Sequence, residues 1–465
     1  MKRIATLLAL LTPMFLLLAC GGANSGSSTQ TGNQQGQVFI TGEDAPVSSV
    51  VAFNITINKI TLNNSSTSVT ALSTPTAVDF GRLIGLRSLL GFNTLPQGTY
   101  DSVTFTFEAS SPAPVISYVD FGTNPPSVQN LAGTLTSSTV TVPFPNGQPL
   151  TVTSKGLAGL HVDFNLHHSL ATDAGGQMTG TINPVITVMA VSATDEVGEI
   201  TDFTGNVVST NVAGNSFVVQ GPYSFQKTID VNSSTLYNGS NSLSTLVPDA
   251  IISVIGIVQA DGSILANGVE LITTDHAFIS GRILAVNPIS GPVQTVTMWV
   301  GEELGTSGVI PVDTVQTIDL SAVTTYDICF FDNILTNQFF NNSTLVVGQR
   351  IFIGGTVAGS TFTPDMVSLR RQGVVGQLVA NSVTVTGGTG SNQGYFQMQN
   401  DALMSYSAGG PFTVYTGDKT FFANINGLAG LQSAGTPNLL ARGLVFKNQI
   451  NGKPIVVSGR VRVLP

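Results

Sequence analysis

The stretch HVDFNLHHS at residues 161–169 contains three of the four histidines in the chain. Side chains two residues apart in a strand point to one face, so His161, Asp163 and His167 are expected to share a face. Two imidazoles and one carboxylate form a possible ligand set for a metal ion. Solvated polar residues on an outward strand face explain the same pattern, and no second ligand cluster accompanies it. We favour this second explanation and predict no metal ion and no cofactor.

An acidic run, TDEVGEITD, follows at residues 194–202. Clustered carboxylates attract hard cations such as calcium. The spacing of Asp195, Glu196, Glu199 and Asp202 matches no known calcium loop, however. The sequence therefore favours a solvated acidic linker over residues 193–202.

The chain offers few groups for catalysis. A nucleophile needs a base beside it, and the only histidines are His161, His167, His168 and His276. No GxSxG, HExxH or GxxxxGK pattern is present. Two distant carboxylates that meet in a cleft could still cleave a glycan, but no segment marks such a pair. We predict no catalytic residues and no enzyme activity, which leaves a glycan-acting hydrolase as the least supported alternative.

Three other features have simple structural explanations. GGTGSNQG at residues 387–394 is predicted to be a hairpin loop, because no helix signal follows it. Cys329 is predicted to be a buried apolar side chain. Basic residues near the C-terminus are predicted to protect edge strands, with contact to an anionic envelope polymer as the alternative. They are Lys419, Arg442, Lys447, Lys453, Arg460 and Arg462.

The N-terminus has the pattern of a secretion signal. Lys2 and Arg3 precede an apolar run that is too short, and too interrupted by Pro13, for a permanent transmembrane helix. Leu17 to Cys20 then resemble the lipobox of bacterial lipoproteins, which implies a signal peptide at residues 1–19 and an acylated Cys20. Residues 20–36 are polar enough to form a flexible tether. A soluble exported protein is the alternative. If the protein is a lipoprotein, Gly21 favours its sorting to the outer membrane.

The composition agrees with an exported protein, and the net charge makes nucleic acid an unexpected partner. Charged residues make up only 9% of the chain, against about 25% in ordinary soluble domains. The net charge of −9 becomes −11 once Lys2 and Arg3 are removed with the signal, so nucleic acid is not expected as a partner. With Cys20 acylated, Cys329 has no cysteine left for an intramolecular disulfide.

Strand patterns dominate the chain, so we predict an all-β fold. VAFNITIN at residues 51–58 alternates apolar and polar residues, and the alternation slips by one after Lys59, which predicts a bulge. DSVTFTFEA at residues 101–109 and LHVDFNL at residues 160–166 repeat the alternation. Only GRLIGLRSLLG at residues 81–91 has the leucine spacing of a short helix.

Residues 37–192 resemble an uncharacterised bacterial lipoprotein domain. The segments GEDAP, LPQGTYDSV and VDFNLHHS follow the order of that family's TDAP, LPAGTYTQI and DFD motifs. The resemblance implies a transthyretin-like or carbohydrate-binding-like β-sandwich. GEDAP has an additional glutamate before the family's acid, and Asn165 stands where the family has an acid. Both changes weaken the expectation of an inherited cation site.

A threefold repeat fills the rest of the chain. Glycines 205, 281 and 376 follow similar openings, and STLVPDAIISVIGIV in the first unit aligns with STLVVGQRIFIGGTV in the second. We predict three small OB-like β-barrels at residues 203–273, 279–371 and 374–465, with Thr235, Thr325 and Thr420 at equivalent positions. These units resemble a second uncharacterised exported family, and one large sandwich is the alternative.

These features predict a membrane-anchored exported lipoprotein of the cell envelope, on its periplasmic or surface face. We expect a non-enzymatic module that binds a glycan or an envelope protein, because rigid β-units present loops for binding. The alternative is a structural or assembly lipoprotein with the repeats as spacers. An exposed aromatic platform favours the first function, and a broad apolar patch favours the second.

Overall fold

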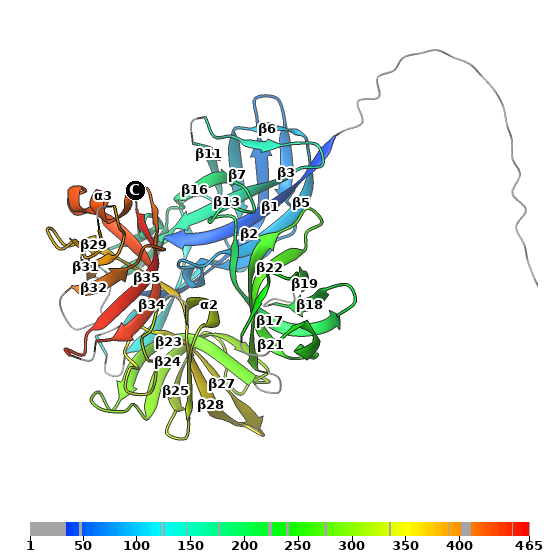
Figure 1. Cartoon of the computed structure of the whole chain (residues 1–465). Helices are drawn as coiled ribbons and strands as arrows, with labels where there is room; N and C mark the ends of the chain where they lie inside the picture. Colours follow the sequence, from blue (N-terminus) through cyan, green and yellow to red (C-terminus); the bar gives the residue numbers. More distant parts are fainter. Residues whose placement is uncertain are drawn as a thin grey trace, which may run out of the picture. The chain divides into compact units, whose positions relative to one another are not determined.

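The computed structural model describes residues 34–464, apart from several short segments (Figure 1). Those segments are residues 46–48, 121, 124–125, 146, 175–176, 222–225, 239–240, 274–276, 334–335, 389, 401–410 and 449. The signal peptide, Cys20, most of the tether and His276 therefore lie outside the described residues, as does the side chain of Asp202. From residue 34 onward the chain forms one compact unit. Among the described residues, no helix is long and apolar enough to span a membrane.

Two large sheets form the first part of this unit. A four-stranded sheet has the order β16-β13-β1-β5, and a second sheet has the order β11-β7-β2-β8-β9, with β3 and β4 paired to β2. The first comprises β1 (Gln35–Ala45), β5 (Ser88–Pro96), β13 (Leu157–Asn165) and β16 (Ile186–Val191). The second comprises β2 (Val50–Asn63), β3 (Ser68–Leu72), β4 (Thr76–Asp79), β7 (Ser102–Phe107), β8 (Val115–Asp120), β9 (Ser127–Ala132) and β11 (Thr139–Pro143).

Short elements complete this part. They are η1 (Phe80–Arg82), β6 (Gly98–Tyr100), β10 (Thr134–Leu135), β12 (Leu150–Val152), α1 (Leu166–Ser169), β14 (Leu170–Thr172) and β15 (Met178–Ile182). One core lies between the two large sheets, where Phe164 of β13 contacts Phe53, Phe80 and Phe107. The predicted bulge is confirmed, because the pairing of β2 with β7 shifts between Ile57 and Lys59.

The helix predicted at residues 81–91 is wrong. Only the single turn η1 precedes Leu83, and Ser88 already begins strand β5. Gly85 has φ +66°, a left-handed conformation that a right-handed helix through residues 81–91 would not allow. The leucine spacing instead reflects burial on two sides, since Leu83 belongs to the sandwich core and Leu89 to the core of the next sheet.

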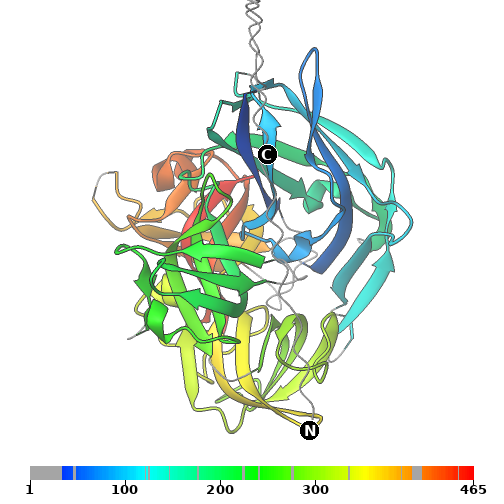
Figure 2. The same cartoon turned by 90° about the vertical axis from the view of Figure 1, so that its right-hand side faces the viewer.

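Three sheets of the same strand order follow, coloured green, yellow-green and orange to red in Figures 1 and 2. The first has the order β19-β18-β17-β21-β22-β20 and closes through a parallel pair of β19 with β22. It contains β17 (Ile200–Asn211), β18 (Ser216–Gln220), β19 (Gln226–Asp230), β20 (Leu236–Tyr237), η3 (Leu243–Thr245), β21 (Ile251–Val258) and β22 (Ile264–Thr273).

The second sheet repeats this order as β25-β24-β23-β27-β28-β26. Its elements are β23 (Ala277–Asn287), β24 (Thr295–Leu304), β25 (Thr314–Asp319), β26 (Thr325–Ile328), α2 (Phe330–Asn333), β27 (Arg350–Ala358) and β28 (Thr361–Leu369). No ladder joins β25 to β28 in the part of the chain that the structure describes, so this ring is open there.

The third sheet has the corresponding path β32-β31-β29-β34-β35-β33 and closes through a parallel pair of β32 with β35. Its elements are β29 (Gln372–Leu378), β30 (Thr384–Val385), β31 (Gly394–Asn400), β32 (Phe412–Thr416), β33 (Phe421–Ala423), α3 (Gly427–Ser433), β34 (Asn438–Lys447) and β35 (Pro454–Val463). A five-stranded Greek-key ring of this kind is the OB-like barrel that the repeat predicts. The loop at residues 387–394 connects the antiparallel strands β30 and β31, as predicted.

The repeated glycines share one structural role. Each lies where an added Cβ would meet a carbonyl oxygen of the neighbouring strand. The distances are 2.4 Å from Gly205 to Gln220, 1.8 Å from Gly281 to Trp299 and 2.4 Å from Gly376 to Gln399. Strand pairing this close therefore excludes every side chain at these three positions.

Gly281→Ala is expected to lower the free energy of unfolding by about 1–3 kcal/mol, because the methyl group forces β23 away from β24. Chemical denaturation measures the loss. Gly388→Ala is the matched control, since nothing lies within 4 Å of its added Cβ, and it should change stability by less than about 0.5 kcal/mol. A Gly281→Ala protein as stable as the control would contradict the close approach.

The predicted equivalence of three threonines is right for two of them. Thr235 and Thr420 each precede a short strand, and their hydroxyls donate to the carbonyls of Ala266 and Ser458 at 2.8 Å. Thr325 instead opens β26 and occupies the position of Leu236, one residue further along. The prediction was displaced by one residue within the Thr324–Thr325 pair.

Candidate functional site

Strands β1 and β13 place four polar side chains next to one another. In their parallel ladder, Thr41 lies opposite His161, and Glu43 lies opposite Asp163. All four are buried, because the sandwich core covers one face of this sheet and the first barrel's core, which includes Phe39 of β1, covers the other. The oxygen Thr41 Oγ1 lies 3.0 Å from His161 Nδ1, and His161 Nε2 lies 3.6 Å from Glu43 Oε2.

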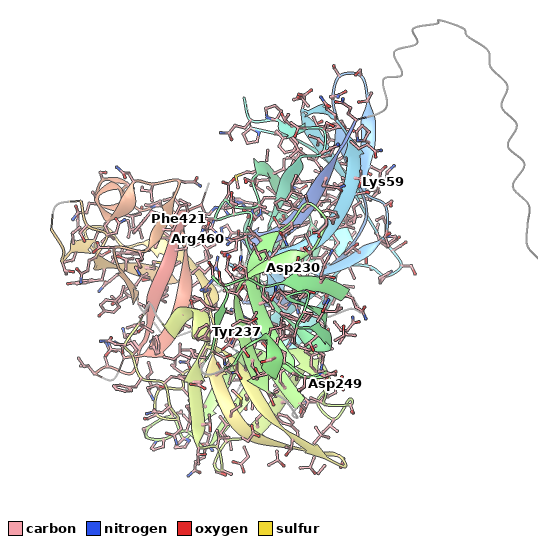
Figure 3. The ribbon with its side chains drawn as sticks, turned by 45° about the vertical axis from the view of Figure 1, so that its right-hand side comes forward. Lys59, Asp230, Tyr237, Asp249, Phe421 and Arg460 are labelled. Atoms are coloured by element: carbon pink, nitrogen blue, oxygen red, sulfur yellow. The ribbon has the colours of Figure 1, made fainter. Side chains whose placement is uncertain are left out.

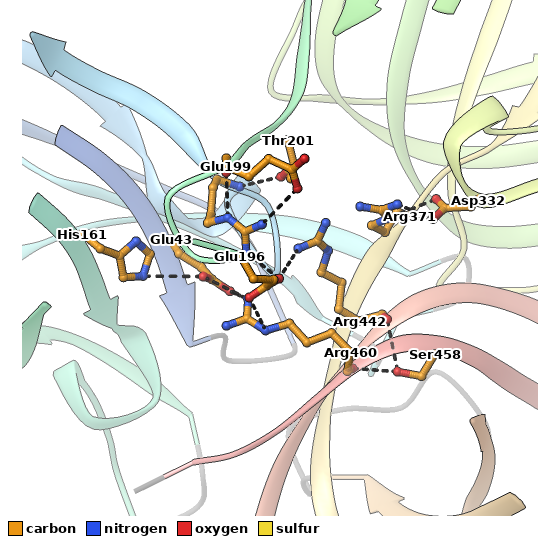
Figure 4. A network of polar contacts seen from close by, with 11 residues as sticks. Glu43, His161, Glu196, Glu199, Thr201, Asp332, Arg371, Arg442, Ser458 and Arg460 are labelled. Carbon is orange, nitrogen blue, oxygen red and sulfur yellow. Dashed lines mark hydrogen bonds and ion pairs between the residues drawn. The ribbon is translucent and has the colours of Figure 1, made fainter. Parts of the chain in front are cut away.

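Glu43 is fully buried, and its main charge partner comes from the far end of the sequence. Arg460 of β35 donates from Nη1 to Glu43 Oε1 at 3.2 Å (Figure 4). On the same strand, Arg462 donates from Nη2 to Asp163 Oδ2 at 2.7 Å. The C-terminal hairpin is thus bonded through two guanidinium groups to the first and the thirteenth strands.

The surroundings shift the pKa values of these groups in a consistent way. Burial alone would raise the pKa of Glu43, but the charges of Arg460 and Arg87 outweigh it and lower that pKa to about 2. Burial lowers the pKa of His161 to about 4, although Glu43 acts in the opposite direction. Glu43 is therefore ionised and His161 neutral at pH 7. Burial also raises the pKa of Asp163 despite the charge of Arg462.

Glu196 connects Arg460 with two other arginines (Figure 4). Its carboxylate lies 3.1 Å from Arg87 Nη1, 3.7 Å from Arg442 Nη1 and 3.5 Å from Arg460 Nε. We call Glu43, Arg87, Glu196, Arg442 and Arg460 the ionic junction. It joins the N-terminal sheet, the segment before β17 and the hairpin β34–β35.

Arg87 is the most enclosed arginine of the ionic junction, with no exposed surface. Its Nε donates to the carbonyl oxygen of Glu199 at 2.8 Å, and its backbone N–H donates to Thr201 Oγ1 at 2.9 Å. Arg442 is held more loosely, because its Nε and Nη1 have no hydrogen-bond partner. Burial and the nearby arginines lower the pKa of Arg442. The junction therefore depends on charge balance more than on hydrogen-bond geometry.

The predicted solvated face at residues 161–167 is wrong. His161 and Asp163 are buried, beside Glu43 and Arg462 respectively, and His167 lies on α1 instead of on the strand. Alternation indicates a solvated face only when one side of a sheet is open, and β13 is covered on both sides. Among the described residues, no group of three or more potential ligands is placed to hold a metal ion.

Two other predictions, the solvated acidic linker and the edge-protecting basic residues, are also corrected by buried ionic contacts. Glu196 and Glu199 of the acidic run are bonded to buried Arg87 and so are not simply solvated linker residues. Arg442, Arg460 and Arg462 do not protect an edge, because Arg442 and Arg460 are buried, Arg462 is half-buried, and all three take part in the ionic contacts above. Neither set carried a sequence signal, since the partners lie more than one hundred residues apart.

Cys329 is buried, as predicted, but it has a polar neighbour. Its Sγ lies 3.8 Å from Glu270 Oε2, which also accepts from Arg370 Nη1 at 2.7 Å. Burial raises the pKa of the thiol well above its usual value, so it remains protonated. These contacts connect the first two barrels.

An aromatic pair lies on the outer surface of the third barrel. Tyr395 of β31 pairs in register with Tyr415 of β32, and the ring centroids are 5.9 Å apart. Tyr415 is 41% exposed. The next outward pair is Gln397 with Thr413. These are the second and third strands of the barrel, the face on which OB-fold proteins bind oligonucleotides and oligosaccharides.

Polar groups border the tyrosine pair on one side. Thr416 follows Tyr415, and its hydroxyl donates to the carbonyl of Asn392 at 2.6 Å, which ties the loop before β31 to the end of β32. In that loop Ser391 Oγ donates to Asp418 Oδ1 at 2.5 Å. We call Tyr395, Tyr415, Asn392, Ser391 and Asp418 the aromatic face. Sequence reasoning missed it, because the two tyrosines are separated by residues with no recognisable motif.

Comparison with known proteins gives one family match, over about a third of the chain. Residues 35–184 match a protein family described as a domain of unknown function (DUF4382). This range covers β1 to β15 and agrees with the expectation of an uncharacterised domain in this part of the chain. No curated protein matches the chain.

Proposed function

We propose that this protein is a lipid-anchored exported protein of the cell envelope that binds a ligand and does not catalyse a reaction. The observation that carries the binding function is the aromatic face on the third barrel. Tyrosine rings offer apolar contact area at low entropic cost, and the adjacent hydroxyl, amide and carboxylate groups can pair with hydroxyl groups. This combination suits a glycan better than an apolar ligand.

The buried titratable groups support the same proposal. His161 and Glu43 have displaced pKa values, which in an enzyme often mark an active site. Here both are enclosed by contacts that join β1, β13 and β35, and each displacement follows from burial and ion pairing. We assign these groups a structural role.

Replacing both Tyr395 and Tyr415 with alanine is expected to weaken glycan binding at least about tenfold, which corresponds to about 1.4 kcal/mol. The measurement is a glycan and envelope-extract binding screen run beside a hydrolase panel. Phe421→Ala is the matched control, because Phe421 is 46% exposed on β33 and lies outside the aromatic face (Figure 3). Equal binding by the double variant, or turnover in the hydrolase panel, would contradict the proposal.

Changing Cys20 to serine is expected to move the protein from the detergent phase to the aqueous phase, because acyl chains on Cys20 would supply the membrane affinity. Detergent-phase partitioning of protein expressed in a bacterial host measures this. The support is the lipobox-like sequence at residues 17–20. Wild-type protein that already partitions into water would show that there is no lipid anchor.

A structural or assembly function is the second candidate. Three loop residues expose nearly their whole side chains, namely Ile289, Phe339 and Ile450. Exposed apolar side chains favour a protein partner when they gather into one patch. These three come from separate loops, so they support this function less directly than the paired tyrosines support binding.

A further inference from the structure

Glu196 is the most exposed member of the ionic junction. Its side chain is 30% exposed, whereas the side chains of Arg87, Arg442 and Arg460 are at most 5% exposed. These three arginines come from separate parts of the chain, just before β5 and from β34 and β35, and they converge on the one carboxylate (Figure 4). An anion from solvent would therefore reach the arginines by way of the position that the Glu196 carboxylate occupies.

The Glu196 carboxylate is held mainly by charge. Its one hydrogen bond among the described residues is accepted from Arg87 Nη1 at 3.1 Å. Arg442 Nη1 and Arg460 Nε lie 3.7 and 3.5 Å from the carboxylate, beyond the range of a good hydrogen bond, and Glu196 Oε2 is buried without a hydrogen-bond partner. A single hydrogen bond must therefore break for this side chain to turn towards solvent.

The arginines around Glu196 leave hydrogen-bond donors unused. In the described part of the chain the side chain of Arg442 donates no hydrogen bond, and its Nε and Nη1 are buried without an acceptor. Arg87 Nη2 and Arg460 Nε are also buried without one. Buried polar groups are normally paired, and guanidinium groups form paired hydrogen bonds with carboxylate or phosphate oxygens. Four unused donors on arginines that share one carboxylate therefore indicate an acceptor that the chain does not supply.

Without Glu196, one arginine of the junction would have no carboxylate. Among the described residues, Arg442 forms an ion pair with Glu196 alone. The other two arginines keep carboxylates of their own at 3.2 and 3.9 Å, in the pairs Arg460–Glu43 and Arg87–Glu199. Arg442 is 5% exposed, so its charge is poorly hydrated. The position of the Glu196 carboxylate therefore requires a negative charge, from Glu196 or from a ligand.

We propose that the ionic junction binds the carboxylate or phosphate group of a small ligand, and that Glu196 occupies this site as an internal substitute. A ligand carboxylate fits, because the Glu196 carboxylate already fills the same space. Phosphate has more acceptor oxygens, which match the unused donors. The site shares no residue with the aromatic face, so it can fail in an experiment without the glycan-binding proposal.

Glu196→Gln removes the internal competitor and makes the site measurable. Inorganic phosphate and acetate are titrated separately into the wild-type chain and the variant by isothermal calorimetry, while sodium chloride holds the ionic strength constant. The variant keeps the shape of the side chain without its charge, so at least one anion should bind at least about tenfold more tightly than to the wild type. The anion that responds distinguishes a carboxylate ligand from a phosphate ligand.

Asp327→Asn is the matched control, because it removes one negative charge from an exposed position on β26, outside the junction. A second substitution shows where the anion binds. Arg442→Gln, added to Glu196→Gln, should abolish the gain in affinity, and it removes no side-chain hydrogen bond of the described fold.

Glu196→Gln remains informative even if it does not fold at ordinary ionic strength. Phosphate or acetate should then restore folding by binding the native state, whereas chloride at equal ionic strength should not. Three results would overturn the proposal. They are an affinity in Glu196→Gln no higher than in Asp327→Asn, an unfolded Glu196→Gln that neither anion restores, and undiminished binding in the double variant.

Discussion

Replacing Arg460 with methionine should lower the free energy of unfolding by about 3–5 kcal/mol, the largest single effect that we expect. The substitution leaves Glu43 ionised and fully buried, with its nearest charge partner removed. It also removes the contact of Arg460 Nε with Glu196. Chemical denaturation at pH 7 measures the loss.

A double substitution separates charge from packing. Arg460→Met combined with Glu43→Gln removes both charges, and it should recover most of the stability that Arg460→Met alone loses. Lys453→Met is the control, because Lys453 is an exposed basic residue of the same C-terminal segment and should change stability by less than about 0.5 kcal/mol. If Arg460→Met were as mild as this control, the ionic junction would have no energetic role.

Lowering the pH should begin to destabilise the protein at pH values well above those at which carboxyl groups usually titrate. His161 has a pKa of about 4 when folded and 6.5 when unfolded, so the unfolded chain binds its proton first as the pH falls. The stability contributed by neutral His161 is complete above pH 6.5 and is lost between pH 6.5 and 4, about 2 kcal/mol of it between pH 7 and 5. Glu43, with a folded pKa of about 2, adds a second loss below pH 4.5.

His161→Asn isolates the first of these losses. Its amide occupies the position of Nδ1 and can keep the bond to Thr41, but it does not titrate. Unfolding free energies measured at pH 7 and pH 5 should therefore differ by about 2 kcal/mol less in this variant than in the wild type. Asp44 and Asp163, whose raised pKa values act in the opposite direction, are present in both proteins and do not affect the comparison. An unchanged difference would mean that His161 titrates normally.

Local patterns predicted the strands and the repeated barrels. The alternation in β2 also predicted the bulge at Lys59. Burial on one face has a period of two residues, so a slip in that period indicates an extra residue in the strand. The glycines at 205, 281 and 376 marked a close approach that recurs in each barrel. Such features depend on residues that are close together in the sequence, so they can be predicted from it.

The ionic junction and the aromatic face could not be predicted in this way. Glu43 and Arg460 meet only because the C-terminal hairpin packs against β1 and β13, and neither residue stands in a distinctive motif. The same strand alternation that identifies β13 also suggested an open face at His161 and Asp163. The whole fold decides whether a second layer covers a sheet. The residue pattern of one strand therefore does not show whether both of its faces are buried.

The pairing of Glu43 with Arg460 spans 417 positions of the chain, which affects how the molecule can be assembled. Chain segments emerge in order during synthesis and export, so Glu43 is present long before Arg460 can pair with it. Until then the acid must stay hydrated, and the sheet around it must remain partly open. Fragments that end before β35 should therefore fold poorly. The barrels share a strand order, but they are not independent units that could be exchanged with one another.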